Sequence, residues 1–91
     1  MTLILKYKND FKKNYKKTNL NKSEQDDFMF IVNSLLNQHT LDKKFKKHSL
    51  KGKLKDLTDI HIRSNLVLLV KITTDTLYLC NIGTHAEVLH L

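Results

Sequence analysis

The sequence predicts an α+β domain in which two N-terminal helices pack on one face of an antiparallel sheet. The predicted elements follow the order β-α-α-β-β-β, with the helices grouped before the last three strands. The chain has 91 residues, enough for one hydrophobic core but too few for two. Hydrophobic residues make up 41% of it and charged residues 27%, as in a globular protein. A single domain over residues 1–91 is therefore expected.

The chain is expected to begin with a strand and a helix. Residues 2–7, TLILKY, alternate loosely between apolar and polar side chains, which is typical of a short strand. Asn9 or Asp10 can cap a helix that follows directly. Phe11 and Tyr15 are four residues apart and would share the buried face of that helix.

A second helix has the clearest signals in the chain. Asn21, followed three residues later by Glu24, predicts a capping box at its start. Its end is expected at about Gln38. Five apolar residues recur at helical spacing and would face the core: Phe28, Ile31, Val32, Leu35 and Leu36.

The C-terminal half is expected to hold a connector and three strands. Periodicity lapses over residues 40–52, a lysine-rich stretch with a few apolar anchors. Strands are predicted at 54–63, 66–72 and 76–82, the last two joined by a hairpin turn. The nearly continuous apolar run that opens the middle strand predicts a central position in the sheet, covered on both faces.

The charge balance favours a polyanionic partner. Sixteen Lys and Arg against nine Asp and Glu give a net charge of +7, and seven lysines lie in each of the ranges 6–22 and 43–55. Such an excess suits nucleic acid, an acidic protein or an anionic membrane surface, although it also serves as a solubilising face. A membrane is the weakest candidate because no apolar run approaches the length of a transmembrane helix. A cytoplasmic protein with no membrane partner is expected.

The stretch TDIHIRSN, residues 58–65, predicts a strand with two different faces. Ile60 and Ile62 would point into the core, while four polar residues, Asp59, His61, Arg63 and Asn65, would point to the other side. This polar face is either an ordinary wet surface or one wall of a site.

Three histidines make the second interpretation chemically specific. His48 follows the second lysine cluster, His61 lies on the polar face, and His85 comes directly after the last strand. Two imidazoles that flank a phosphodiester can take a proton from a 2′-hydroxyl and give one to the leaving 5′-oxygen. Lysine or arginine would stabilise the added phosphoryl charge, and the substrate must be RNA because DNA lacks the 2′-hydroxyl.

Neither a metal site nor a thiol site is predicted. The sequence has no histidine pair at helical spacing and no CxxC motif, so no metal and no cofactor are expected. The single cysteine, Cys80, lies in the apolar run LYLCNI and is interpreted as a small buried hydrophobic residue.

The C-terminal half resembles the RelE/ParE superfamily of toxins from bacterial type II toxin-antitoxin systems, in particular the YafQ branch. Three motifs carry the resemblance: LDKKFKKHSLKGKLKDLTDIHI with its His-x-Leu-x-Gly core, the following IRSNLVLLVKI, and the closing GTHAEVL. The resemblance implies a RelE-like fold and cleavage of mRNA at the ribosome. It also implies inhibition by a cognate acidic antitoxin, with any contact to operator DNA made only through that antitoxin.

The resemblance also assigns roles to residues. His48 is expected to act as general base and His85 as general acid, with His61 and Asp59 orienting the phosphate or a partner imidazole. The residues expected to bind RNA are Lys47, Lys51, Lys53, Lys55, Arg63 and Asn65.

Three positions depart from the family pattern. The family's catalytic aspartate falls on Asn65, a frequent basic residue on Asn81, and a C-terminal aromatic residue on Leu89. An amide cannot accept a proton as a carboxylate does. These departures leave open a non-catalytic relative that binds an antitoxin or poisons a protein target, and also a plain RNA-binding module.

Overall fold

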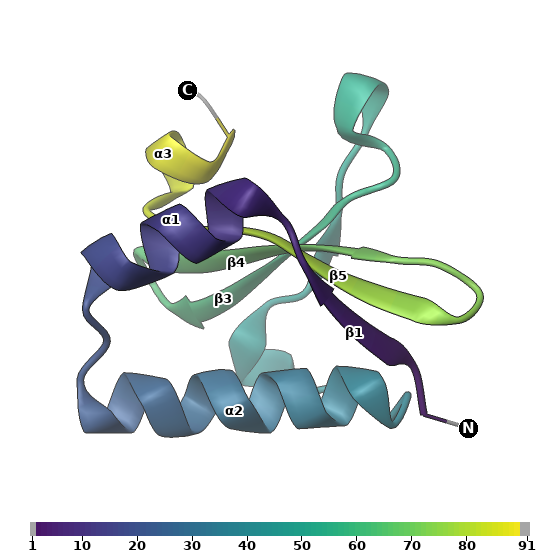
Figure 1. Ribbon diagram of the computed structural model, residues 1–91, viewed down its shortest axis with the longest axis horizontal. Coiled ribbons are helices and arrows are strands. Elements are labelled where there is room, and N and C mark those ends of the chain that lie inside the picture. Colours follow the sequence, from purple (N-terminus) through teal and green to yellow (C-terminus); the bar gives the residue numbers. More distant parts are fainter. Residues whose placement is uncertain (1, 90–91) are drawn as a thin grey trace.

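The computed structural model describes residues 2–89 as one mixed sheet with helices on both faces (Figure 1). The elements are β1 (Ile4–Tyr7), α1 (Asn9–Thr18), α2 (Lys22–Leu36), η1 (Lys43–Phe45), β2 (His48–Ser49), η2 (Gly52–Leu54), β3 (Thr58–Arg63), β4 (Leu66–Ile72), β5 (Thr76–Gly83) and α3 (His85–Leu89). The sheet order is β1-β5-β4-β3-β2. The predicted α+β class and the order of its main elements are confirmed.

The sheet is not wholly antiparallel, and this part of the prediction is wrong. β1 runs parallel to β5, with Ile4 beside Thr76 and Tyr7 beside Leu79, whereas the other strand pairs are antiparallel. Hydrophobic alternation indicates which side chains face the core, but it carries no information on strand direction. The long connection through α1 and α2 allows β1 to return as a parallel edge strand.

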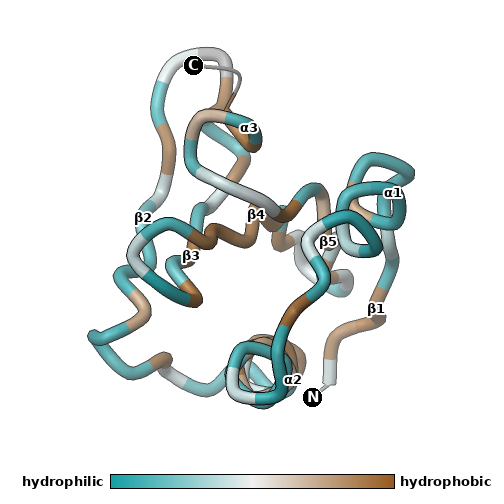
Figure 2. The backbone as a smooth tube through the Cα atoms, turned by 90° about the vertical axis from the view of Figure 1, so that its left-hand side faces the viewer, coloured by the Kyte–Doolittle hydropathy of each residue, from teal (hydrophilic) through white to brown (hydrophobic). Residues whose placement is uncertain are grey.

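One large core lies between the sheet and the first two helices. Phe11 of α1 and Phe28 of α2 stack with ring centroids 6.0 Å apart, and both belong to the same buried cluster. Leu66, Leu68 and Val70 of β4 supply its sheet side. In Figure 2, α2 and α3 lie on opposite sides of the sheet, which is why β4 is covered on both faces as predicted.

A smaller cluster lies on the opposite face under α3. Val67 and Leu69 of β4 pack there with Val88 of α3, and Leu50 and Leu57 border them. A short C-terminal helix was not among the predicted elements. It covers an apolar patch that the main core does not reach, and it lies beside the polar side of β3.

The helix starts differ from each other in how well they were predicted. In α2 the Asn21 side chain accepts a hydrogen bond from the Glu24 backbone N–H at 2.8 Å, and the Glu24 side chain accepts one from the Asn21 backbone at 3.0 Å. This confirms the predicted capping box. The predicted cap of α1 is wrong: the helix begins at Asn9, and its N-cap is Lys8, which makes no side-chain capping bond.

The predicted strand 54–63 begins later than expected. Residues Gly52–Leu54 form a 3-10 turn, and β3 starts only at Thr58. Gly52 has a φ of +69°, a left-handed conformation that turns the chain before the strand.

Within residues 2–89, no helix is both long and apolar enough to cross a bilayer.

Candidate functional site

β3 divides its side chains between the core and the opposite face of the sheet. Ile60 and Ile62 are buried in the main core, as predicted, while Asp59 and His61 point to the face that α3 partly covers. Asp59 is only 2% exposed, although it is a carboxylate. A buried charge of this kind requires polar partners.

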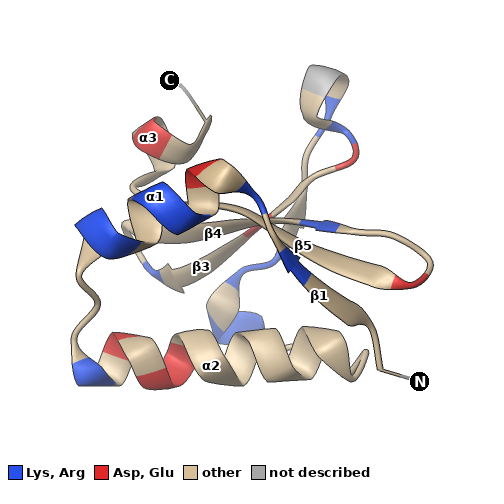
Figure 3. Cartoon of the chain, in the orientation of Figure 1, with Lys and Arg blue, Asp and Glu red and all other residues tan. Residues whose placement is uncertain are grey.

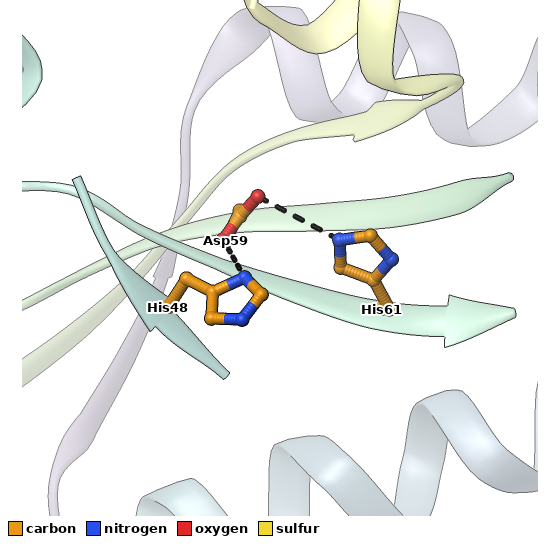
Figure 4. Close-up of side chains that lie close together, drawn as sticks. All are labelled: His48, Asp59 and His61. Atoms are coloured by element: carbon orange, nitrogen blue, oxygen red, sulfur yellow. Dashed lines mark ion pairs between the residues drawn. The ribbon is translucent and has the colours of Figure 1, made fainter. Parts of the chain in front are cut away.

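Three imidazoles supply those partners. His85 Nε2 lies 3.0 Å from Asp59 Oδ2, within hydrogen-bond distance. His48 Nδ1 lies 3.6 Å from Oδ1, and His61 Nε2 lies 3.8 Å from Oδ2. Figure 4 shows the carboxylate between the His48 and His61 rings. His48, His61 and His85 therefore converge around Asp59 in the structure.

Strand pairing brings His48 to the cluster. β2 contains only two residues, and its antiparallel register with β3 places His48 directly beside Asp59. Just before β2, Phe45 is 1% exposed and anchors the connector in the main core. A short strand behind a buried anchor thus fixes the imidazole at the edge of the sheet.

A capping box fixes His85. The Thr84 hydroxyl accepts a hydrogen bond from the Glu87 backbone N–H at 3.2 Å, and Glu87 Oε1 accepts one from the Thr84 backbone N–H at 2.9 Å. The hydrogen bond from the Thr84 backbone N–H is the main cause that lowers the pKa of the Glu87 carboxyl, and the Thr84 side chain lowers it further. His85 is the first residue of α3, so the closing GTHAE motif aims its imidazole at Asp59.

Gly83 is required directly before this turn. Its φ is +155°, and a Cβ at this position would lie 3.1 Å from Glu87 Oε1. We expect Gly83→Ala to cost about 2–3 kcal/mol of the free energy of unfolding, because alanine is strained there and crowds the cap.

Gly52→Ala is the matched control in denaturant unfolding. Its φ is also positive, but nothing lies within 4 Å of a Cβ there. The alanine variant at Gly52 is expected to lose about 1 kcal/mol. Equal losses for the two variants would contradict the steric role assigned to Gly83.

Exposure divides the cluster into two layers. The side chains of His48 and His85 are 60% and 43% exposed, whereas those of His61 and Asp59 are 15% and 2% exposed. The His61 ring meets both outer rings edge-on, with centroids 5.9 Å from His48 and 5.2 Å from His85. Two accessible imidazoles therefore lie over an inner imidazole and a buried carboxylate.

The sequence places this site in a known family. The family model described as the bacterial toxin of type II toxin-antitoxin system, YafQ, matches residues 3–90. The chain belongs to the YafQ toxin family. Comparison with curated protein sequences finds no significant match.

Solved structures support the assignment. A metal-bound toxin from Helicobacter pylori is 30% identical, with a TM-score of 0.83 over 94% of this chain and 98% of that one. The DinJ–YafQ complex from E. coli is 24% identical, with a TM-score of 0.83 over 94% and 97%. The YoeB dimer from Staphylococcus aureus is 15% identical, with a TM-score of 0.74 over 93% and 99%. The last two show the shared fold.

In this YafQ-family toxin, the surroundings of His61 disfavour its protonated form. Burial is the main cause that lowers its pKa below the ordinary 6.5, and His85, His48 and Lys46 lower it further, while Asp59 opposes them. The inner imidazole is therefore harder to protonate than an exposed histidine.

The lowered pKa of His61 predicts a loss of stability in acid. Below about pH 6.5 the unfolded chain protonates His61 while the folded chain resists it, so the free energy of unfolding falls. His61→Asn removes this contribution and should lose less stability between about pH 7.5 and about pH 5.5. Urea unfolding at both pH values measures the difference, and an equal fall in both proteins would contradict it.

Arg63 does not join the histidine cluster, although the sequence predicted that it shares one face of the strand with Asp59 and His61. The ladder shifts register between His61 and Arg63, which ends the simple alternation of side chains. The Arg63 guanidinium forms an ion pair with Asp27 and donates to Ser23 Oγ at 2.6 Å, both in α2. Arg63 still borders a hollow of about 270 Å³ that His61 and Lys46 also line.

The predicted RNA-binding lysines lie before and after β2 in the chain. Lys47 directly precedes His48, and Lys51 and Lys55 flank η2; all three are exposed. Figure 3 shows positive charge on α1 and along the connector that carries these lysines. The side chain of Lys53 lies outside what the structure describes.

The two asparagines that depart from the family pattern lie outside the cluster. Asn65 is exposed in the turn between β3 and β4 and borders a groove with Glu87. Asn81 is 5% exposed; its Oδ1 accepts from Asn14 Nδ2 at 2.7 Å and from the Ile82 backbone N–H at 2.9 Å. Asn81 therefore ties β5 to α1.

Sequence reasoning missed three residues that contribute to the site. Lys46 adopts a left-handed conformation with φ of +43° at the end of η1 and lowers the pKa of His61. No sequence pattern marked it. Thr84 and Glu87 stand at the spacing of a capping box, so the signal for their role was present in the sequence.

Cys80 is partly buried on β5, and burial raises the pKa of its thiol. A protonated thiol is a poor nucleophile. This agrees with its interpretation as a packing residue.

Proposed function

We propose that this toxin is a metal-independent endoribonuclease that cleaves mRNA at the ribosome and thereby inhibits translation in the cytoplasm. The observation that supports it most is the pair of accessible imidazoles, His48 and His85, over the buried carboxylate of Asp59. Accessible imidazoles suit proton transfer at a phosphodiester because histidine is the most frequent general acid or base.

In this scheme, each proton transfer uses the ring nitrogen that points away from Asp59. His48 directs Nδ1 toward Asp59, which leaves Nε2 to take the proton from the 2′-hydroxyl. The resulting oxygen attacks the adjacent phosphorus. His85 directs Nε2 toward Asp59, which leaves Nδ1 to donate the proton to the departing 5′-oxygen. The products are a 2′,3′-cyclic phosphate and a 5′-hydroxyl end.

Asp59 and His61 act as positioning residues in this scheme. The carboxylate fixes the orientation of His85 and stabilises its protonated form. His61 lies between the two outer rings and holds them apart. The exposed Lys47, together with Lys51, would contact phosphates and help to neutralise the charge that develops on the phosphoryl oxygens.

We also propose that a cognate acidic antitoxin inhibits the toxin. The net charge of +7 favours such a partner, and the related YafQ from E. coli forms a complex with DinJ. In this scheme operator DNA is contacted only through the antitoxin.

A second candidate is an antitoxin-binding relative without catalysis. Asn81 favours it, because this side chain is buried and bonded to Asn14, and so supplies no cation to the site. In that case the histidine cluster would persist without turnover.

The experiment is expression of the double variant His48→Ala, His85→Ala in a translating extract. RNA cleavage and translation arrest should both be lost, while antitoxin binding remains. His39→Ala is the matched control because His39 is exposed in the chain after α2, and it should retain full activity. Unchanged cleavage by the double variant would overturn the catalytic assignment, and absence of cleavage by the unaltered toxin would support the second candidate.

A further inference from the structure

We propose that the hollow lined by Lys44, Lys46 and Arg63 binds a backbone phosphate of the RNA, on the 5′ side of the nucleotide that supplies the 2′-hydroxyl. The choice of this phosphate rests on the proposed function, which decides which nucleotide is cut. The hollow has a volume of about 270 Å³ and lies between α2, the connector and β3. Asp27 and His61 complete its charged and imidazole lining.

The charge of the hollow suits an anion. Three cationic side chains line it, those of Lys44, Lys46 and Arg63, against the carboxylate of Asp27. Both lysines are exposed, and among residues 2–89 no carboxylate forms an ion pair with either of them. Lysine and arginine side chains of this kind neutralise the phosphates of a nucleic acid, and the volume is small for a complete cofactor.

Arg63 is held at the wall of the hollow and still has donors for a ligand. Its guanidinium forms an ion pair with Asp27, and it donates to Ser23 Oγ at 2.6 Å and to the Ile62 carbonyl at 2.9 Å. A guanidinium carries five N–H donors, and these contacts use three of them. The side chain is 38% exposed, so a phosphate oxygen can reach the remaining donors.

Lys46 lies where the hollow meets the histidine cluster. It ends η1 two residues before His48, with a φ of +43° that is uncommon for a residue other than glycine. Burial is the main cause that lowers the pKa of His61, and the charge of Lys46 lowers it further. The Lys46 ammonium is therefore close to the imidazole that lines the same hollow.

The positions of the two outer histidines give the RNA strand a direction. β2, which carries His48, pairs with one edge of β3, whereas α3, which carries His85, packs on β4 at the other edge. In the proposed reaction His48 serves the 2′-hydroxyl, and His85 serves the 5′-oxygen of the next nucleotide. The 5′ side of the strand then runs past His48 toward the connector. The first phosphate in that direction is the 5′ phosphate of the cut nucleotide.

Binding of a short, fully 2′-O-methylated RNA, which lacks the nucleophile and cannot be cut, tests the hollow without catalysis. Lys46→Ala should weaken binding about three- to tenfold and reduce the slope of log K against log salt by about 0.7, as for one phosphate contact on a single strand. Asp27→Asn should bind RNA more tightly because it removes negative charge from the hollow. Such a gain in affinity cannot come from partial unfolding.

Lys6→Ala is the matched control for the change in charge. Lys6 is exposed on β1, at the opposite edge of the sheet from β2, and its variant should keep the salt slope of the unaltered toxin. Equal effects of Lys46→Ala and Lys6→Ala, or weaker binding by Asp27→Asn, would overturn the site. If Lys46→Ala weakens antitoxin binding but not RNA binding, the hollow contacts the antitoxin and the site is also overturned.

Cleavage of mRNA with one neutral methylphosphonate linkage tests the direction of the strand in translating ribosomes. The linkage is placed one position 5′ or 3′ of the cut, each time after a 2′-deoxy nucleotide that keeps the linkage stable. The 5′ linkage should slow cleavage by the unaltered toxin about tenfold and cleavage by Lys46→Ala much less, because the variant has already lost that contact. The 3′ linkage should slow both proteins equally. The reverse pattern would overturn the assignment to the 5′ phosphate.

The two assays together separate this site from the proposed function. If the unaltered toxin cuts no RNA but the variants change binding as expected, the hollow stands as an RNA site. The proposed function then fails, and the assignment to the 5′ phosphate falls with it. If the toxin cuts RNA but Lys46→Ala and Asp27→Asn bind RNA as the unaltered toxin does, the hollow is overturned and the proposed function stands.

Discussion

Replacing Asp59 by asparagine is expected to lower the rate of RNA cleavage by about 10²–10⁴-fold while leaving the fold intact. The amide keeps the size of the carboxylate but loses the charge that faces His85 Nε2 at 3.0 Å. The effect should fall on kcat rather than KM, because Asp59 is too buried to contact RNA.

The Asp59→Asn variant should lose activity without a matching loss of stability. Asp59 Oδ1 has no hydrogen-bond partner, so removing the buried charge relieves a desolvation cost. At about pH 7.5 the free energy of unfolding should change by less than about 1 kcal/mol. Asp56→Asn is the control, because Asp56 is exposed three residues earlier. A large loss of stability in Asp59→Asn, or full activity, would contradict the positioning role.

Replacing Phe45 by alanine is expected to cost about 3–5 kcal/mol of the free energy of unfolding, a large share of the stability of a domain of this size. Phe45 is 1% exposed in the main core and anchors η1, which leads directly into the strand that carries His48. The variant should therefore lose both stability and cleavage activity.

Phe30 provides a close control for this substitution. Its ring contacts that of Phe45 with centroids 6.1 Å apart, but Phe30 itself is 55% exposed. Phe30→Ala should cost at most about 1.5 kcal/mol, the range of a ring–ring contact. Denaturant unfolding of the two variants gives the comparison, and similar losses would show that Phe45 does not anchor the connector.

The sequence predicted the elements whose signals are local. The capping box of Asn21 and Glu24 and the continuous apolar run of β4 each identify an element through neighbouring residues, and both were confirmed. The parallel pairing of β1 with β5 depends on how the chain returns after two helices, so local alternation could not reveal it. The late start of β3 depends on the left-handed Gly52 and the turn that follows it.

Part of the candidate site could likewise be predicted from the sequence. Alternation along β3 placed Asp59 and His61 on one face, and the family motifs brought in His48 and His85. Arg63 could not be placed in this way, because the register shift after His61 and the ion pair with Asp27 are tertiary features. The pairing of His48 with Asp59 was also hidden, because the two residues come from strands that meet only in the fold.

The most direct test of the central claim is cleavage of mRNA that carries a single 2′-deoxy nucleotide at the cut site, in translating ribosomes. If His48 takes a proton from the 2′-hydroxyl, the unmodified strand is cut to a 2′,3′-cyclic phosphate and the deoxy strand stays intact. Cleavage of the deoxy strand at the same position and rate would contradict the mechanism.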